Sequence, residues 1–211
     1  NIMAQDKKVE QITSMEDDFA QWYTDIVKNA DLADYSGVKG CMIIRPYGYA
    51  IWENIQREMD KRFKAQGVEN AYFPLLIPMS FFTKEAEHVE GFAPEVAVVT
   101  VGGGETLAEP LVIRPTSETI IGSMYSKWIQ SYRDLPMRLG ETSTLFRNED
   151  SGEMHGLIRV RQFTISEGHL VLRPDQLEDE FRDCLDLAKY CLDTVGLLDK
   201  CTFRFSQWDP A

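Results

Sequence analysis

The feature that most constrains this chain is a pair of predicted strands, 138–147 and 157–172, joined by a short polar loop. The loop sequence Asp150-Ser151-Gly152-Glu153 contains residue types that leave β geometry at little cost. Strict alternation along the second strand would place these side chains on one face: Arg159, Arg161, Phe163, Ile165 and Glu167. Two arginines and a glutamate do not suit a hydrophobic core, so we expect this face to bind a polar ligand.

The residue types on that face predict which ligand it would take. Arginine forks bind phosphate oxygens in bidentate fashion, and a phenylalanine ring offers a surface on which a nucleobase can stack. A neighbouring glutamate can accept a hydrogen bond from an amine. The opposing interpretation is a solvated hairpin whose charges pair with one another.

Composition limits the classes of protein that this chain can belong to. The chain has 22 basic and 34 acidic residues, and its net charge of −12 argues against a general nucleic-acid coat. Yet the segment 133–173 contains six arginines against six acids, so charge is balanced around the hairpin in an otherwise acidic chain. The four cysteines form no Cys-x-x-Cys pair and are expected to be reduced and mostly buried. That cysteine pattern is typical of a cytoplasmic protein, and no apolar run approaches 18 residues, so no membrane span is expected.

The hairpin residues resemble motif 2 of the class II aminoacyl-tRNA synthetases, with the pattern Phe-Arg-x-Glu, loop, Arg-x-x-x-Phe-x-x-x-Glu. The resemblance implies that Arg147 contacts the α-phosphate of ATP and the amino acid as the catalytic residue, and that Arg159 holds the outer phosphates. It also implies that Phe163 stacks under adenine while Glu149 reads the exocyclic amine. Mg²⁺ would bridge the phosphates.

The same resemblance runs from Ser14 to Trp208 and implies an α+β fold, in which helices flank an antiparallel sheet. A predicted helix from Pro46 to Gln66, then Gly67, then a strand 68–78 resembles motif 1, which implies a homodimer through residues 45–78. Motif 3 and an anticodon-binding domain are missing. We therefore expect residues 1–211 to be one partial catalytic domain, with a flexible segment at 1–12.

Local patterns predict the remaining elements. A capping box at Thr13-x-x-Glu16 predicts a helix over 13–30. Further helices are expected at 117–131, capped by Thr116, and at 173–196, and further strands at 96–101, 110–115 and 201–207. The run Gly102-Gly103-Gly104 is interpreted as a hairpin turn, because no Gly-Lys-Ser/Thr follows it.

Two segments resemble prolyl-tRNA synthetases. The sequence Arg-Pro-Thr-Ser-Glu implies that Thr116 and Glu118 bind proline, although the two residues also suit the start of a helix. Glu167-Gly168-His169 would line the proline pocket. One departure is Ile165, which stands where this family often has tryptophan.

The segment Met154-His155-Gly156-Leu157 is more similar to threonyl-tRNA synthetase, which holds zinc with one cysteine and two histidines. That cysteine would fall at 116–118, where none is present, and His169 alone matches the set, so no zinc is expected. Proline is favoured over threonine, with tRNA(Pro) as the partner of the whole protein. The sequence is also compatible with a non-catalytic paralogue that binds amino acid or tRNA, and with a dimerisation module.

Overall fold

The protein is described by a computed structural model over residues 12–85 and 96–206. The segment predicted to be flexible, 1–12, lies outside the described residues except for residue 12. In chain order the described helices and strands are α1 Phe19–Asn29, β1 Ala33–Tyr35, β2 Met42–Ile44, α2 Pro46–Ala65, β3 Glu69–Asn70, β4 Leu76–Pro78, α3 Met79–Glu85, β5 Ala97–Gly102, β6 Glu105–Ile113, α4 Glu118–Trp128, β7 Met137–Phe146, β8 Gln162–Val171 and α5 Leu177–Thr194.

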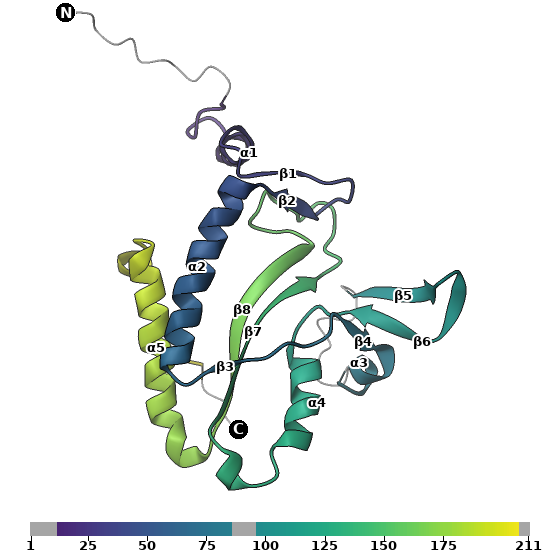
Figure 1. Cartoon of the computed structure of the whole chain (residues 1–211). Coiled ribbons are helices and arrows are strands. Elements are labelled where there is room, and N and C mark those ends of the chain that lie inside the picture. Colours follow the sequence, from purple (N-terminus) through teal and green to yellow (C-terminus); the bar gives the residue numbers. More distant parts are fainter. Residues whose placement is uncertain (1–11, 86–95, 207–211) are drawn as a thin grey trace, which may run out of the picture.

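The predicted hairpin forms the centre of the molecule (Figure 1). Strands β7 and β8 pair antiparallel over ten residues each, from Met137 opposite Val171 to Phe146 opposite Gln162. Strand β3 adds to β7 in parallel, while β4, β6 and β5 form a second, antiparallel sheet. The prediction of an α+β fold with helices around an antiparallel sheet is confirmed.

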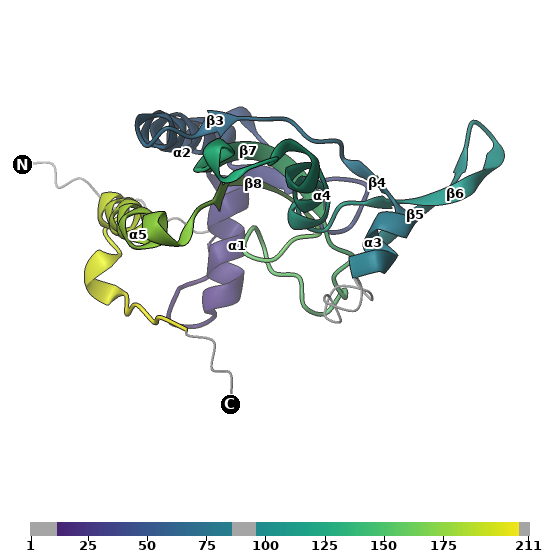
Figure 2. The same cartoon turned by 90° about the horizontal axis from the view of Figure 1, so that it is seen from below.

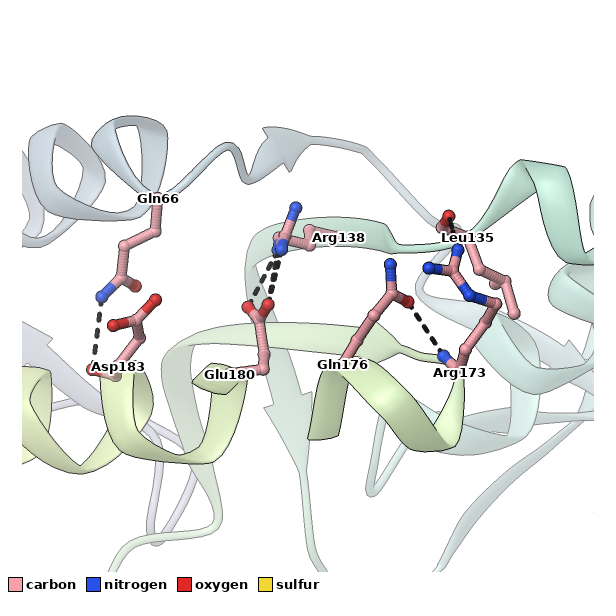
Figure 3. Close-up of polar contacts among 7 residues, drawn as sticks. All are labelled: Gln66, Leu135, Arg138, Arg173, Gln176, Glu180 and Asp183. Atoms are coloured by element: carbon pink, nitrogen blue, oxygen red, sulfur yellow. Dashed lines mark hydrogen bonds and ion pairs between the residues drawn. The ribbon is translucent and has the colours of Figure 1, made fainter. Parts of the chain in front are cut away.

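Helices cover both faces of the β7–β8 hairpin. Figures 1 and 2 show α2 and α5 together on one side and α4 on the other. On the first side, Arg138 of β7 donates to both carboxylate oxygens of Glu180 on α5, with its Nε 2.8 and 2.9 Å from them (Figure 3). This ion pair raises the pKa of Arg138 above its ordinary value. The bidentate contact fixes α5 against the back of the hairpin.

The α4 side contains a compact hydrophobic core. Phe73, Ile77, Ile120 and Ile121 are buried together, and Tyr125 and Leu139 pack against them. Tyr125 also donates its hydroxyl to the carbonyl oxygen of His169 at 2.8 Å. The core therefore joins α4 to the strand β8 that carries the predicted pocket residues.

Two predicted helix starts are wrong. Helix α1 begins at Phe19 with Asp18 as its N-cap, whose carboxylate accepts from the amide of Gln21 at 3.0 Å. Thr13 instead donates to Asp25 through both its amide and its hydroxyl. At α4 the N-cap is Ser117 rather than Thr116, and no side chain caps this helix. The start of α2 at Pro46 and the left-handed Gly67, with φ of 79°, are as predicted.

Several predicted strands also differ. The segment 68–78 is divided between β3 and β4 in different sheets, with Pro74 in the interval between them. Strand β8 begins at Gln162 rather than near residue 157, and residues 201–206 form no strand. Of the four free cysteines, Cys184 and Cys201 are exposed, so the prediction that they are mostly buried is wrong. None of the helices described is long and apolar enough to cross a membrane.

Candidate active site

The register of the β7–β8 hairpin gathers the predicted site residues on one face. Residues directly opposite on antiparallel strands point to the same side, and every second residue shares that side. The pairs on the face that α4 borders are Leu139 with His169, Glu141 with Glu167, Ser143 with Ile165, and Leu145 with Phe163. The face thus runs from an aromatic ring at one end to ionisable side chains at the other.

The aromatic end brings Arg147 and Phe163 together. Arg147 follows the last residue of β7, and its guanidinium carbon lies 5.4 Å from the centroid of the Phe163 ring. Its Nε donates to the carbonyl oxygen of Pro115 at 3.1 Å. These contacts hold the guanidinium above the ring, where a planar base and a phosphate could be bound side by side.

Arg159 lies just before β8, on the loop that closes the hairpin. One of its terminal nitrogens is 2.7 Å from a carboxylate oxygen of Glu149 and 2.7 Å from one of Glu153. The Glu149 carboxylate is nearly buried, whereas about half of the Arg159 side chain is exposed. Arg159 therefore presents a partly solvated cation at the rim of the face.

Arg161 does not join this group, and the prediction that it shares the face is wrong. The chain bends at Arg161, so the alternation of β8 begins only at Gln162. Arg161 turns toward the backbone instead and donates from Nε to the carbonyl oxygen of Glu149 at 2.9 Å. It braces the loop and is not aimed at a ligand.

The other end of the face contains the pair Glu167 and His169. The Nε2 atom of His169 is 3.4 Å from a carboxylate oxygen of Glu167. Attraction to His169, with a smaller contribution from the Ser117 hydroxyl, lowers the pKa of Glu167 below its usual 4.5. Glu167 in turn raises the pKa of His169 above 6.5, and the charges of Glu118 and Glu141 act in the same direction. This end is therefore suited to a cationic amine.

Thr116 and Glu118 lie beside each other where β6 leads into α4. The Thr116 hydroxyl donates to the Glu118 carboxylate, which is exposed at the start of the helix. The negative charge of Glu118 also helps to raise the pKa of His169, and the Ser117 hydroxyl helps to lower the pKa of Glu167, so the start of α4 lies near this end of β8. The structure thus brings the predicted proline-binding residues to one end of the hairpin.

Sequence reasoning missed a buried ion pair beneath this end. Arg114 and Glu141 are 2% and 3% exposed, and their side chains are joined by hydrogen bonds of 2.9 and 3.3 Å. Glu141 also accepts from the backbone amide of Phe73 at 3.1 Å. The alternation of side chains along β7 could have revealed part of this pair, because it places Glu141 on the same face as the predicted pocket.

Several buried polar atoms at this end have no hydrogen-bond partner within the described ranges. They are the Ser143 hydroxyl and Nε of Arg114, together with the Ser117 hydroxyl, Oε1 of Glu167 and Nε2 of His169, which lie near one another without good hydrogen-bond geometry. Buried polar groups are ordinarily satisfied, so a cluster of such atoms favours a bound polar ligand. Among residues 12–85 and 96–206, no group of three His, Cys, Asp or Glu side chains is placed to hold a metal ion.

Comparison with known proteins identifies the family. The model of the tRNA synthetase class II core domain (G, H, P, S and T) matches residues 103–209, half of the chain. The chain belongs to this class II synthetase family. The hairpin of this synthetase core lies inside the match, together with β6, α4 and α5.

Curated relatives of this class II core include proline–tRNA ligases. The proline–tRNA ligase of Alkaliphilus oremlandii is 63% identical over 161 residues, which are 76% of this chain and 33% of the relative. That of Lachnoclostridium phytofermentans is 53% identical over 198 residues, 92% of this chain and 41% of the relative. The chain thus spans between a third and two-fifths of the length of these relatives.

Solved structures agree with the sequence matches. Prolyl-tRNA synthetase of Giardia lamblia, in complex with prolyl-adenylate, is 36% identical with a TM-score of 0.81, covering 87% of this chain and 37% of that one. The enzyme of Cryptosporidium parvum, complexed with halofuginone and AMPPNP, is 37% identical with a TM-score of 0.80, covering 87% and 38%. The predicted resemblance to prolyl-tRNA synthetases is confirmed.

Proposed function

We propose that this chain forms the ATP- and proline-binding part of a proline–tRNA ligase, which activates proline as prolyl-adenylate and transfers it to tRNA(Pro). The observation that carries the proposal is the single face of β7 and β8, with Phe163 under Arg147 at one end and Glu167 with His169 at the other. The relatives named above and the prolyl-adenylate bound to the Giardia enzyme support the same substrates. The enzyme would act in the cytoplasm.

The nucleotide would bind at the aromatic end. Adenine stacks on Phe163, a contact that every base can make. Arg159 exchanges its contact with Glu153 for the outer phosphates, because a phosphate offers more acceptor oxygens than one carboxylate. Glu149, already fixed beside Arg159, accepts from the exocyclic amine of adenine. Arg147 lies between the base and the amino acid and contacts the α-phosphate.

Proline would bind at the ionisable end. Its ammonium group is held by carboxylates of Glu118 and Glu167, and Thr116 positions Glu118. A cation taken out of water needs such partners, since an unpaired buried charge is costly. His169 borders the pyrrolidine ring and keeps Glu167 oriented. The proline carboxylate then points toward Arg147 and the α-phosphate.

The reaction follows from this placement. An oxygen of the proline carboxylate attacks the α-phosphorus, the bond to the β-phosphate oxygen breaks, and pyrophosphate leaves with its electron pair. A hydroxyl of the terminal tRNA adenosine later attacks the prolyl carbonyl and releases AMP. The chain's residues supply orientation and positive charge and form no covalent intermediate.

Mg²⁺ is expected to bind with ATP through the phosphate oxygens, where it would neutralise charge as pyrophosphate departs. This ion usually takes one or two protein carboxylates and completes its shell with phosphate and water. Glu153, which Arg159 would release on binding the outer phosphates, is a carboxylate that could join the shell of such an ion.

A homodimer through residues 45–78 is a further part of the proposal. Large apolar side chains of this segment are exposed: Tyr47, Ile51, Ile55, Tyr72 and Leu75. Exposed apolar patches commonly mark protein interfaces. Sedimentation of the parent and of Ile55→Glu would test this, because the dimer should dissociate only in the variant.

Proline-dependent exchange of pyrophosphate into ATP tests the proposed function on the full-length gene product. Exchange with proline and much less with threonine is expected. Exchange that favours threonine would contradict the amino-acid assignment. A non-catalytic paralogue would bind a prolyl-adenylate analogue in calorimetry without exchange, and a dimerisation module would show neither activity.

A further inference from the structure

Helix α1 contacts the loop of the β7–β8 hairpin, residues 147–161, although more than a hundred residues separate them in sequence. The Tyr23 ring on α1 stacks on the imidazole of His155, with ring centroids 5.7 Å apart and planes 24° apart. The next residue, Gly156, approaches the same ring so closely that a Cβ there would lie 2.3 Å from Cε1 of Tyr23. The ring and the loop backbone therefore fit together without room for a side chain.

The backbone of His155 is hydrogen-bonded to the backbone of Arg159. The His155 amide donates to the Arg159 carbonyl oxygen at 3.0 Å, and the Arg159 amide donates to the His155 carbonyl oxygen at 3.1 Å. The two residues thus form an antiparallel bridge within the loop. His155 therefore links the Tyr23 ring directly to the arginine expected at the outer phosphates.

A second contact from the same N-terminal region fixes the other end of the loop. The carbonyl oxygen of Gly40 accepts from the amides of Arg161 and Gln162, at 2.8 and 3.1 Å. A Cβ at Gly40 would lie 2.5 Å from the sulfur of Met154, so this approach is also tight. The loop is therefore held at two points by the region that precedes α2.

We propose that Tyr23 is a positioning residue for ATP: its ring fixes His155 and, through the bridge, the backbone from which Arg159 reaches the phosphates. This inference depends on the proposed function, in which Arg159 binds the nucleotide. A loop rich in Asp, Ser and Gly has many conformations, and ordering it on binding would cost affinity. The stacked ring removes part of that cost before ATP arrives. Proline binds at the far end of the face, so its affinity does not depend on Tyr23.

The test measures KM for ATP and KM for proline separately in pyrophosphate exchange by the full-length protein. Tyr23→Ala should raise KM for ATP roughly tenfold, as expected for loss of one aromatic contact, and leave KM for proline within about twofold. Tyr23→Phe keeps the ring and should behave as the parent. Tyr35→Ala is the matched control, because Tyr35 is an exposed tyrosine of the same region whose ring contacts Lys28.

A double variant protects the test against simple misfolding. Gly156→Ala alone should also raise KM for ATP, since its methyl group meets the Tyr23 ring. Added to Tyr23→Ala, it should cost much less, because the ring is gone, although the φ of 49° at this position strains alanine in both backgrounds. If the increase in KM for ATP in the double variant equalled the product of the increases in the two single variants, the ring and Gly156 would act separately. That result would overturn the proposal.

Hydrogen exchange separates this proposal from the proposed function. Tyr23→Ala should speed exchange of the His155 and Arg159 amides, whether or not substrate is present. Faster amide exchange with an unchanged KM for ATP would refute the positioning role while proline activation stands. If the parent protein showed no proline-dependent exchange of pyrophosphate into ATP, the proposed function would be refuted, and the role of Tyr23 with it.

Discussion

Glu141 and Glu167 lie directly opposite each other on β7 and β8, with their side chains on the same face. The first has a buried cation as its direct partner, because Arg114 joins it in an ion pair of 2.9 Å. Glu141 is therefore committed to the fold, while Glu167 faces His169 and is the carboxylate proposed to bind the amine of proline. Two carboxylates at adjacent positions thus take different tasks.

Removing the buried partner should destabilise the fold strongly. Arg114→Ala leaves the Glu141 carboxylate buried without its cation, a change that typically costs about 3–5 kcal/mol. Urea denaturation measures the free energy of unfolding. Arg182→Ala is the control: its exposed pair with Glu178 on α5 should be worth less than about 1 kcal/mol. Equal losses in the two variants would show that burial of the Arg114 pair has no energetic consequence.

The pair of Glu167 and His169 predicts a pH-dependent stability. In the folded protein the pKa of His169 is raised above 6.5. The contribution of His169 to the free energy of unfolding is therefore complete below pH 6.5 and is lost as the pH rises through the raised pKa. The lowered pKa of Glu167 has the opposite effect. The contribution of Glu167 to the free energy of unfolding is present above pH 4.5 and is lost as the pH falls through the lowered pKa of the folded protein.

The stability gap between the parent and His169→Gln should therefore be largest near pH 5.5 and shrink toward pH 8.5. Chemical denaturation at several pH values measures this gap, and NMR titration of His169 gives its pKa directly. Glu167→Gln should lower that pKa. A gap that is constant or grows with pH would contradict the assigned interaction.

Phe163 predicts a defect confined to the nucleotide. Phe163→Ala removes the stacking surface, a loss of about 1–3 kcal/mol per base, so KM for ATP should rise about 5- to 150-fold. Phe163→Tyr keeps the surface and serves as the control. Steady-state pyrophosphate exchange gives both Michaelis constants. An equal rise in KM for proline would mean that the ring supports the whole face rather than the base.

The sequence predicted the parts of the structure that depend on local pattern. The hairpin was visible from its turn residues and the alternation of its second strand, and α2 from Pro46 at its start and Gly67 after its end. Ser117 rather than Thr116 is the N-cap residue of α4, and Asp18 rather than Thr13 caps α1, because several residues near each start could cap a helix.

Contacts between distant segments were not predictable in this way. The pairing of Arg114 with Glu141 and the stack of Tyr23 on His155 join elements whose relative placement depends on the whole fold. The same holds for Arg161, whose turn toward Glu149 breaks an alternation that the sequence alone extends to residue 157. The candidate site residues were found through their family resemblance, and their individual roles stay predictions.

The central claim is that Arg147, held over Phe163, binds the α-phosphate where charge develops as proline is activated. The most direct test is proline-dependent pyrophosphate exchange by the full-length protein, comparing the parent with Arg147→Ala and with Arg182→Ala as a surface control. Loss of one preorganised donor predicts a rate at least about 10²-fold lower for Arg147→Ala and an unchanged rate for the control. Exchange by Arg147→Ala at the parent's rate would contradict the account.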